Sequence, residues 1–131
     1  DGDGGRAPRR ASDAEKAAIA ERDREDGRGK FLLVNFYSHS ARMGLHQDRD
    51  EKEFSAPVLS VSLGDSCLFR VGGTTRSAAT VSVRLSSGDV VILGGKGRLA
   101  FHGVDRIYPE TSTLLKKGGR INLTLRRVTL P

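Results

Sequence analysis

Short apolar runs separated by turn-forming residues make up the chain from residue 31 onward. Valine, leucine and phenylalanine dominate these runs, often in alternation with polar positions, as in half-buried β-strands. Glycine, serine and aspartate lie between the runs, and none of the runs has the period of an amphipathic helix. The expected strands are 31–36, 57–63, 67–71, 80–85, 90–93, 98–104 and 120–128.

Residues 1–30 are charged and poor in large apolar side chains. Ser12 and Glu15 have the spacing of a capping box, but mostly alanines follow, and so short a helix is marginal without tertiary contacts. We expect a linker or insertion here, poorly ordered or weakly helical, with a marginal helix over about 13–25. Residues 31–131 are then expected to form one all-β domain, because short strands at this spacing are typical of a sandwich or jelly roll.

Length and charge narrow the classes of function. At 131 residues, the chain has the size of one domain. Its formal net charge of +6 arises wholly in residues 31–131, which hold 14 basic and 8 acidic side chains. A basic domain suggests a polyanionic partner such as nucleic acid, although many basic domains bind none.

Membrane, secretion and zinc-finger signals are missing from the sequence. It has no run of about 18 apolar residues to span a membrane and no signal-peptide stretch. We expect an intracellular, non-secreted protein without a membrane partner, and the sequence favours neither cytoplasm, nucleus nor organelle. The oligomeric state is open, with a monomer favoured. Cys67 is the single cysteine, which excludes an intramolecular disulfide and a cysteine-based zinc site, and we expect it in the core. His39 follows the first strand and is expected to be solvated.

Three residues have the chemistry of an iron site. His46 and Asp48 form an H-x-D pair, and on extended backbone residues two apart point to the same side. His102, in a later strand, can complete a set of two imidazoles and one carboxylate, the ligand set of non-haem Fe(II) oxygenases. About one chain in four or five of this composition contains H-x-D by chance, so a structural histidine is the alternative at each position.

The last expected strand places a row of polar side chains on one face. Its members are Arg120, Asn122, Thr124 and Arg126. The two arginines, about 20 Å apart at Cα, are too distant to share one carboxylate, but from both ends they can hold a small dicarboxylate between them. A solvent-exposed polar face on an edge strand is an alternative of equal weight.

Four segments together carry a specific resemblance. In chain order they are NFYSHSARMGLHQDRDE (35–51), APVLSVSLGDSCLFRVGG (56–73), SGDVVILGGKGRLAFHGV (87–104) and RINLTLRR (120–127). From about residue 31 to 128, the chain resembles the AlkB family of Fe(II)- and 2-oxoglutarate-dependent dioxygenases, which remove alkyl groups from nitrogen atoms of nucleobases in DNA or RNA. The resemblance implies a double-stranded β-helix, a jelly roll with iron in its mouth.

The resemblance also implies roles for individual residues. The implied iron ligands are His46, Asp48 and His102. The residues implied to bind 2-oxoglutarate are Arg120, Asn35 and Tyr37 at the distal carboxylate, and Arg126 and Asn122 at the end next to the keto group. Asp50 is implied to meet the exocyclic amine of the target base. Apart from the resemblance, the excess of basic residues offers loop candidates for phosphate contacts, although a merely solvated charge is the favoured interpretation at each: Arg76, Lys96, Arg98, Lys116 and Lys117.

The implied activity is oxidative dealkylation of 1-methyladenine- or 3-methylcytosine-type bases, with O₂ as co-substrate and with release of formaldehyde, succinate and CO₂. The partner would be alkylated DNA or RNA, single-stranded or with its target base flipped out of the stack. The family's N-terminal substrate-lid segment is missing from the match, so we expect a C-terminal catalytic core, either a fragment or a natural truncation. Two alternatives stay open: a cofactor-binding module without turnover on nucleic acid, and the same chemistry on protein or lipid.

Overall fold

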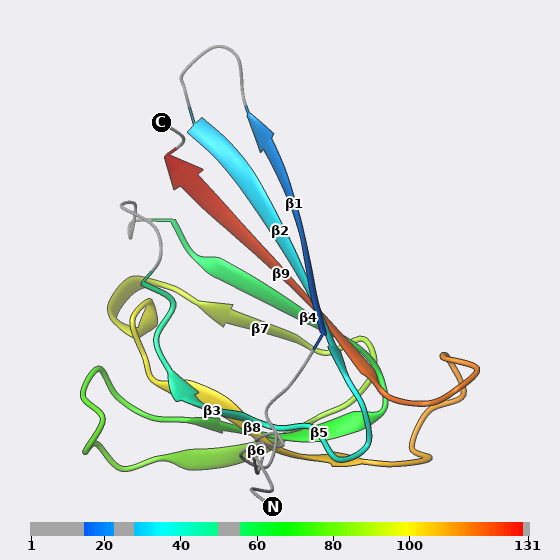
Figure 1. Ribbon diagram of the computed structural model, residues 1–131. Coiled ribbons are helices and arrows are strands. Elements are labelled where there is room, and N and C mark those ends of the chain that lie inside the picture. Colours follow the sequence, from blue (N-terminus) through cyan, green and yellow to red (C-terminus); the bar gives the residue numbers. More distant parts are fainter. Residues whose placement is uncertain (1–14, 23–27, 50–55, 130–131) are drawn as a thin grey trace, which may run out of the picture.

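The computed structural model describes residues 15–22, 28–49 and 56–129. Their strands form two sheets that face each other (Figure 1). In the five-stranded sheet the order is β1 (Glu15–Arg22), β2 (Arg28–Tyr37), β9 (Arg120–Thr129), β4 (Val58–Gly64) and β7 (Val90–Leu93). In the four-stranded sheet the order is β3 (Met43–His46), β8 (His102–Tyr108), β5 (Ser66–Val71) and β6 (Val81–Leu85).

The chain crosses repeatedly from one sheet to the other, and all strand pairings are antiparallel. These crossovers and pairings give a jelly roll, so the all-β fold expected from the strand spacing is confirmed. One short 3₁₀ helix, η1 (Gly95–Gly97), follows β7. Among the described residues, no helix is long and apolar enough to cross a membrane.

Six of the seven expected strands are present, with ends that differ by up to three residues. The first part of the expected strand 98–104 is wrong, because the chain forms η1 and turns before β8 begins at His102. There the amides of Gly97, Arg98 and Ala100 donate to carbonyls three residues back, at 2.9, 3.2 and 3.1 Å. The glycine-rich sequence favours this tight turn. Strand β3 was not expected, since its sequence MGLH lacks the β-branched residues that mark the equally short strand β7.

Strand β1 shows that the expected marginal helix is wrong over Glu15–Arg22, and the rest of that helix lies outside the described residues. β1 pairs with β2 from Glu15 opposite Phe36 to Arg22 opposite Gly29. A helix of this length gains little by itself. Pairing, in contrast, satisfies backbone groups that β2 would otherwise present along an edge. Tertiary context therefore overrides the weak local preference.

The apolar core lies between the sheets. Its buried members are Tyr37, Ala41, Cys67, Phe69, Leu85, Val104 and Ile107. Cys67 has no exposed surface, which confirms its prediction as a core residue, and burial raises the pKa of its thiol. His39 is exposed, as expected. The remaining space between the sheets is lined by both polar and apolar side chains.

Candidate metal centre and active site

Three side chains with metal-binding chemistry converge where β3 meets β8. His46 ends β3 and lies directly opposite His102, the first residue of β8, with the ring centroids 4.4 Å apart. Asp48 is buried, and its carboxylate oxygens lie 4.0 Å from Nε2 of His46 and 3.5 Å from Nε2 of His102. One ligand atom from each residue lies within 4.8 Å of the others, a spacing that one metal ion can bridge.

Backbone carbonyls orient both imidazoles. Nδ1 of His46 lies 2.9 Å from the carbonyl oxygen of Gly44, and Nδ1 of His102 lies 2.9 Å from that of Ala100. Because a carbonyl oxygen only accepts, each Nδ1 carries the proton and each Nε2 keeps a lone pair on the side of Asp48. Metal-ligating histidines are commonly supported in this way. Burial lowers the pKa of His102, which favours the neutral form that binds metals.

A cavity of about 400 Å³ adjoins these three residues. One wall is the polar face of β9, where Arg120, Thr124 and Arg126 are buried while the intervening Leu125 is 43% exposed. β9 is a central strand between β2 and β4. The polar row of β9 therefore faces the cavity, and the alternative prediction of a solvent-exposed polar face on an edge strand is wrong.

Arg120 is the deepest cation of the cavity wall. It is 1% exposed, its Nη2 donates to Oγ of Ser62 at 3.0 Å, and its guanidinium carbon lies 5.1 Å from the ring centre of Tyr37. Its Nε and Nη1 atoms are buried without a hydrogen-bond partner. Unsatisfied buried N–H groups are costly, so this position suits an acceptor such as a carboxylate.

Two asparagines and a tyrosine extend the polar wall. Asn35 lies opposite Asn122 in the pairing of β2 with β9, and its buried Oδ1 lacks a hydrogen-bond partner. Asn122 donates to Oγ1 of Thr124 at 3.0 Å and accepts from Ser60. Burial raises the pKa of Tyr37, although the Arg120 guanidinium opposes this shift, so the phenol stays protonated and can donate.

The two arginines lie beside different groups of the cavity. Nη2 of Arg126 lies 4.0 Å from Oδ1 of Asp48, next to the histidines, whereas Arg120 lies beside Tyr37. The cavity thus has one cation near the candidate metal ligands and another cation away from them. This order suits a dicarboxylate that reaches the metal with one end only.

Comparison with known proteins shows the family of this chain. The family model described as the 2OG-Fe(II) oxygenase superfamily matches residues 5–126. The chain belongs to this superfamily.

Its relatives are AlkB-type proteins. An alpha-ketoglutarate-dependent dioxygenase AlkB homolog of Caulobacter vibrioides is 64% identical over 95 residues, which cover 72% of this chain and 43% of the relative. The DNA N(6)-methyladenine demethylase ALKBH1D of Arabidopsis thaliana is 46% identical over 104 residues, 72% of this chain and 24% of that protein. The solved structure of OsALKBH1 has a TM-score of 0.67 and 47% identity, covering 73% of this chain and 48% of that one. The chain therefore spans less than half of the length of these proteins.

The superfamily uses Fe(II), 2-oxoglutarate and O₂, and the described residues fit these groups. Two neutral imidazoles and one carboxylate are a ligand set for Fe(II) that leaves further coordination positions open. The buried, partly unsatisfied guanidinium of Arg120 suits the distal carboxylate of 2-oxoglutarate. All eight residues expected to bind iron or 2-oxoglutarate line the same cavity.

Two residues support the candidate site of this dioxygenase-family chain in roles that were not predicted from the sequence. Both interpretations of Arg98, as a phosphate contact and as a solvated charge, are wrong, because Arg98 is 3% exposed and donates to the carbonyls of Asp48 at 2.9 Å and Ala56 at 3.0 Å. Gln47 donates to the carbonyl of Leu99 at 2.8 Å and so ties the end of β3 to the turn before β8. The only sequence signal for either residue is its place next to a motif.

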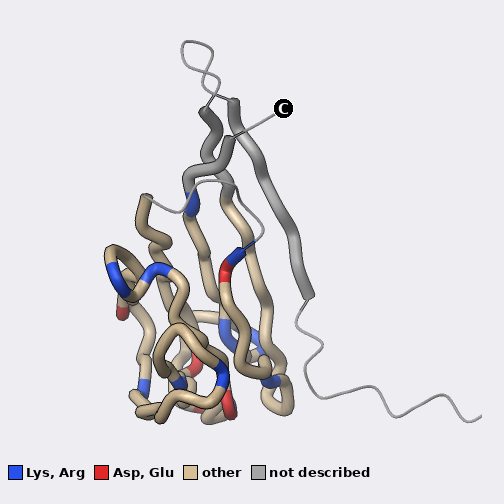
Figure 2. The backbone as a smooth tube through the Cα atoms, turned by 90° about the vertical axis from the view of Figure 1, so that its left-hand side faces the viewer, with Lys and Arg blue, Asp and Glu red and all other residues tan. Residues whose placement is uncertain are grey.

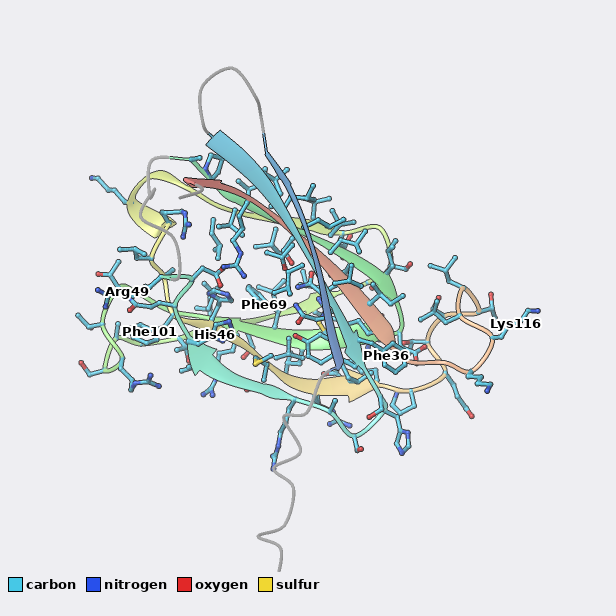
Figure 3. The ribbon with its side chains drawn as sticks, turned by 45° about the horizontal axis from the view of Figure 1, so that its top comes forward. Phe36, His46, Arg49, Phe69, Phe101 and Lys116 are labelled. Atoms are coloured by element: carbon cyan, nitrogen blue, oxygen red, sulfur yellow. The ribbon has the colours of Figure 1, made fainter. Side chains whose placement is uncertain are left out.

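The residues expected to meet substrate have different outcomes. Arg76 is exposed, donates to the carbonyl of Leu45 at 3.2 Å and lies 4.9 Å over the ring of Phe101. Figure 3 shows Phe101 at the same end of the molecule as His46. Arg76 is thereby placed near the candidate metal ligands. Asp50 lies outside the described residues, and its expected contact with the base stays a prediction.

Basic residues are spread over several segments of the described backbone (Figure 2). Lys116 lies at the opposite end of the molecule from His46 (Figure 3). A phosphate contact at Lys116 would therefore be remote from the metal centre, whereas Arg76 is near it.

Proposed function

We propose that this chain forms the catalytic core of an Fe(II)- and 2-oxoglutarate-dependent dioxygenase that removes alkyl groups from nucleobase nitrogens in DNA or RNA. The observation that carries the proposal is the convergence of His46, Asp48 and His102 on one cavity that also holds two buried arginines. Relatives named as DNA and tRNA demethylases support a nucleic-acid substrate. The preferred bases are of the 1-methyladenine and 3-methylcytosine type.

The metal would be held by Nε2 of His46, Nε2 of His102 and the carboxylate of Asp48. The carbonyls of Gly44 and Ala100 keep both rings in the required tautomer. Arg98 holds the backbone of Asp48 in place. When bound, Fe(II) with 2-oxoglutarate and O₂ supplies the oxidation of the N-alkyl carbon, which leaves as formaldehyde while 2-oxoglutarate becomes succinate and CO₂.

The protein's part toward 2-oxoglutarate is to neutralise and orient it. Arg120 would pair with the distal carboxylate, with Tyr37 and Asn35 as further hydrogen-bonding groups. Arg126 and Asn122 would hold the end nearer to the metal. Burial of both guanidinium groups strengthens these pairs, because little water competes for the carboxylates.

On the nucleic-acid side, the target base would leave its stack to enter the cavity. Arg76 would contact the phosphate backbone of the nucleic-acid strand that carries this base, because its guanidinium lies beside Leu45, the residue that precedes His46. Asp50, two residues beyond Asp48, would meet the exocyclic amine of the base. These proposed contacts do not discriminate between DNA and RNA.

The first test is anaerobic absorption spectroscopy of the purified chain with Fe(II), before and after addition of 2-oxoglutarate. We expect a new charge-transfer band in the visible range, because the keto acid chelates an iron held by the three side chains. A His46→Ala variant, which removes one ligand, should show no band. Absence of the band in the folded wild-type chain would contradict the proposed site.

The second test is formaldehyde release from an oligonucleotide that contains 1-methyladenine. We expect iron-dependent release together with succinate, and neither product from the His46→Ala variant. Succinate without formaldehyde would favour the alternative of a cofactor-binding module, or of a substrate other than nucleic acid. Parallel DNA and RNA oligonucleotides decide between the two polymers.

A further inference from the structure

A buried carboxylate lies at the crossover from β4 to β5, outside the cavity wall. Asp65 is 3% exposed, and among the described residues no cationic side chain is paired with it. Instead, its Oδ1 accepts from the amides of Thr111 at 3.2 Å and Ser112 at 3.1 Å, and its Oδ2 accepts from the amide of Gly119 at 2.9 Å. Three such bonds offset much of the cost of burying the charge.

These three amides belong to the two ends of one loop. Residues 109–119 carry the chain from β8 in one sheet to β9 in the other. Thr111 and Ser112 lie near the start of this loop, and Gly119 is its last residue. The carboxylate of Asp65 therefore bonds to both ends of the crossover.

At the other end of the loop, both backbone groups of Gly119 form hydrogen bonds with Asp65. Its amide donates to the Asp65 side chain, and its carbonyl accepts from the Asp65 amide at 2.9 Å. The neighbouring residues are register partners, Gly64 opposite Arg120. The fit is tight, because a Cβ at Gly64 would lie 2.5 Å from the carbonyl oxygen of Gly119. Asp65 thereby fixes the backbone from which Arg120 projects into the cavity.

We propose that Asp65 is a positioning residue, which sets the Arg120 guanidinium for the distal carboxylate of 2-oxoglutarate. The inference rests on the proposed function for its ligand. Nε and Nη1 of Arg120 lack hydrogen-bond partners, while Nη2 donates to Ser62 and the guanidinium lies beside the Tyr37 ring. The aim of the two unpartnered nitrogens also depends on the backbone of Arg120, which pairs with Tyr37 and Gly64 and follows Gly119 directly, so we expect loss of the Asp65 bond to Gly119 to shift it.

The test compares Asp65→Ala and Asp65→Asn with a matched loop variant, Thr111→Val. Thr111→Val removes hydroxyl bonds to Ser66 and Tyr108 at the start of the loop but keeps the amide bond to Asp65. The affinities for Fe(II) and for 2-oxoglutarate are measured anaerobically on each folded protein. Asp65→Ala should weaken 2-oxoglutarate binding at least tenfold and Fe(II) binding less than twofold. Asp65→Asn, which keeps one acceptor oxygen, should fall between Asp65→Ala and the wild type.

Thr111→Val should lower the melting temperature but change the affinity for 2-oxoglutarate less than twofold. This contrast separates positioning of Arg120 from a general loss of stability. Unchanged 2-oxoglutarate affinity in folded Asp65→Ala would overturn the proposal, as would an equal loss in Thr111→Val. If Asp65→Ala does not fold, the comparison of Asp65→Asn with Thr111→Val decides by the same criteria.

A measurement without ligand keeps this inference separate from the proposed function. In the metal-free protein, amide exchange at Gly119 should be at least tenfold faster in the Asp65 variants, and the Arg120 Nε–H resonance should move. Both signals should stay at their wild-type values in Thr111→Val. A wild-type chain that binds no 2-oxoglutarate would contradict the proposed function alone, since exchange and resonance position still decide what Asp65 does. Wild-type signals in the Asp65 variants would refute the positioning role.

Discussion

At the scale of single residues, Arg120 best shows how burial and function are linked in this molecule. It is the largest side chain among the fully buried ones of the described region, at 1% exposure. A buried guanidinium with two unpartnered nitrogens costs stability unless a ligand supplies acceptors. The residue is therefore better explained by the ligand contact that we propose for it than by a contribution to the core.

Replacement of Arg120 by alanine should weaken 2-oxoglutarate binding by about 2–5 kcal/mol, because a desolvated carboxylate would lose its partner. Isothermal titration of the Fe(II) form under nitrogen measures this change. Arg106→Ala is the matched control, since Arg106 is exposed and stacks over Tyr108, outside the cavity wall. Equal affinities of the wild type and Arg120→Ala would remove Arg120 from the binding site.

Cys67 allows a second test at this scale. Its side chain has no exposed surface, and burial raises the pKa of its thiol, so the reactive thiolate is scarce below that pKa. We expect no alkylation by iodoacetamide at pH 8 in the native protein and complete alkylation in denaturant. Mass spectrometry after each treatment measures the fraction of chains alkylated at Cys67. Rapid labelling of the native chain would mean that β5 and β8 separate readily.

At the scale of elements, the candidate metal centre depends on how closely β3 approaches β8. Gly103 follows His102, and a Cβ at this position would lie 2.6 Å from the backbone oxygen of Met43 on β3. Only a residue without a side chain allows this approach. The two histidines face each other because the strands that carry them are in backbone contact.

Gly103→Ala should therefore push β3 away and weaken Fe(II) binding at least tenfold. Gly44→Ala is the matched control, since a Cβ at Gly44 has no atom within 4 Å. Equilibrium titration with Fe(II), together with melting curves of both variants, distinguishes a moved ligand from an unfolded chain. Equal affinities in the two variants would show that β3 adjusts without disturbing the histidines.

At the scale of the whole molecule, the five-stranded sheet has a polar inner row and an apolar outer row. Ser60 and Thr124 lie toward the cavity, whereas their neighbours Leu59 and Leu125 are 36% and 43% exposed. Leu59 pairs with both Leu125 and Ile92, which is 64% exposed, so the row crosses three adjacent strands. A contiguous apolar row of this kind promotes association of the chain.

The double variant Ile92→Thr, Leu125→Thr should show less concentration-dependent association than the wild type. Its affinity for 2-oxoglutarate should stay within twofold of the wild-type value. The stability change should be small, about 0.5 kcal/mol per site, because both side chains are largely exposed. Light scattering over a range of protein concentrations measures the association. Unaltered scattering would mean that the row contributes little to contacts between molecules.

Local pattern predicted six strands because each alternates or is strongly apolar over its own length. It did not predict β1, whose strand form depends on pairing with β2, or the turn before β8, which depends on three local amide bonds. Residue spacing predicted the histidines, Asp48 and the polar row of β9, and the resemblance of four segments added Asn35 and Tyr37, which line the same cavity. Arg98 was assigned wrongly, because burial of an arginine in a glycine-rich turn has no local signature.

By itself, the sequence determined which chemical groups are available: one H-x-D pair, a later histidine and a strand that alternates polar with apolar residues. These are covalent facts, and the period of a strand follows from its backbone geometry. Tertiary structure alone decided which face of β9 is buried, because that depends on the sheet opposite it. It also decided the tautomer of each histidine and the anchoring of Arg120, because both depend on backbone groups from crossovers that no local pattern specifies.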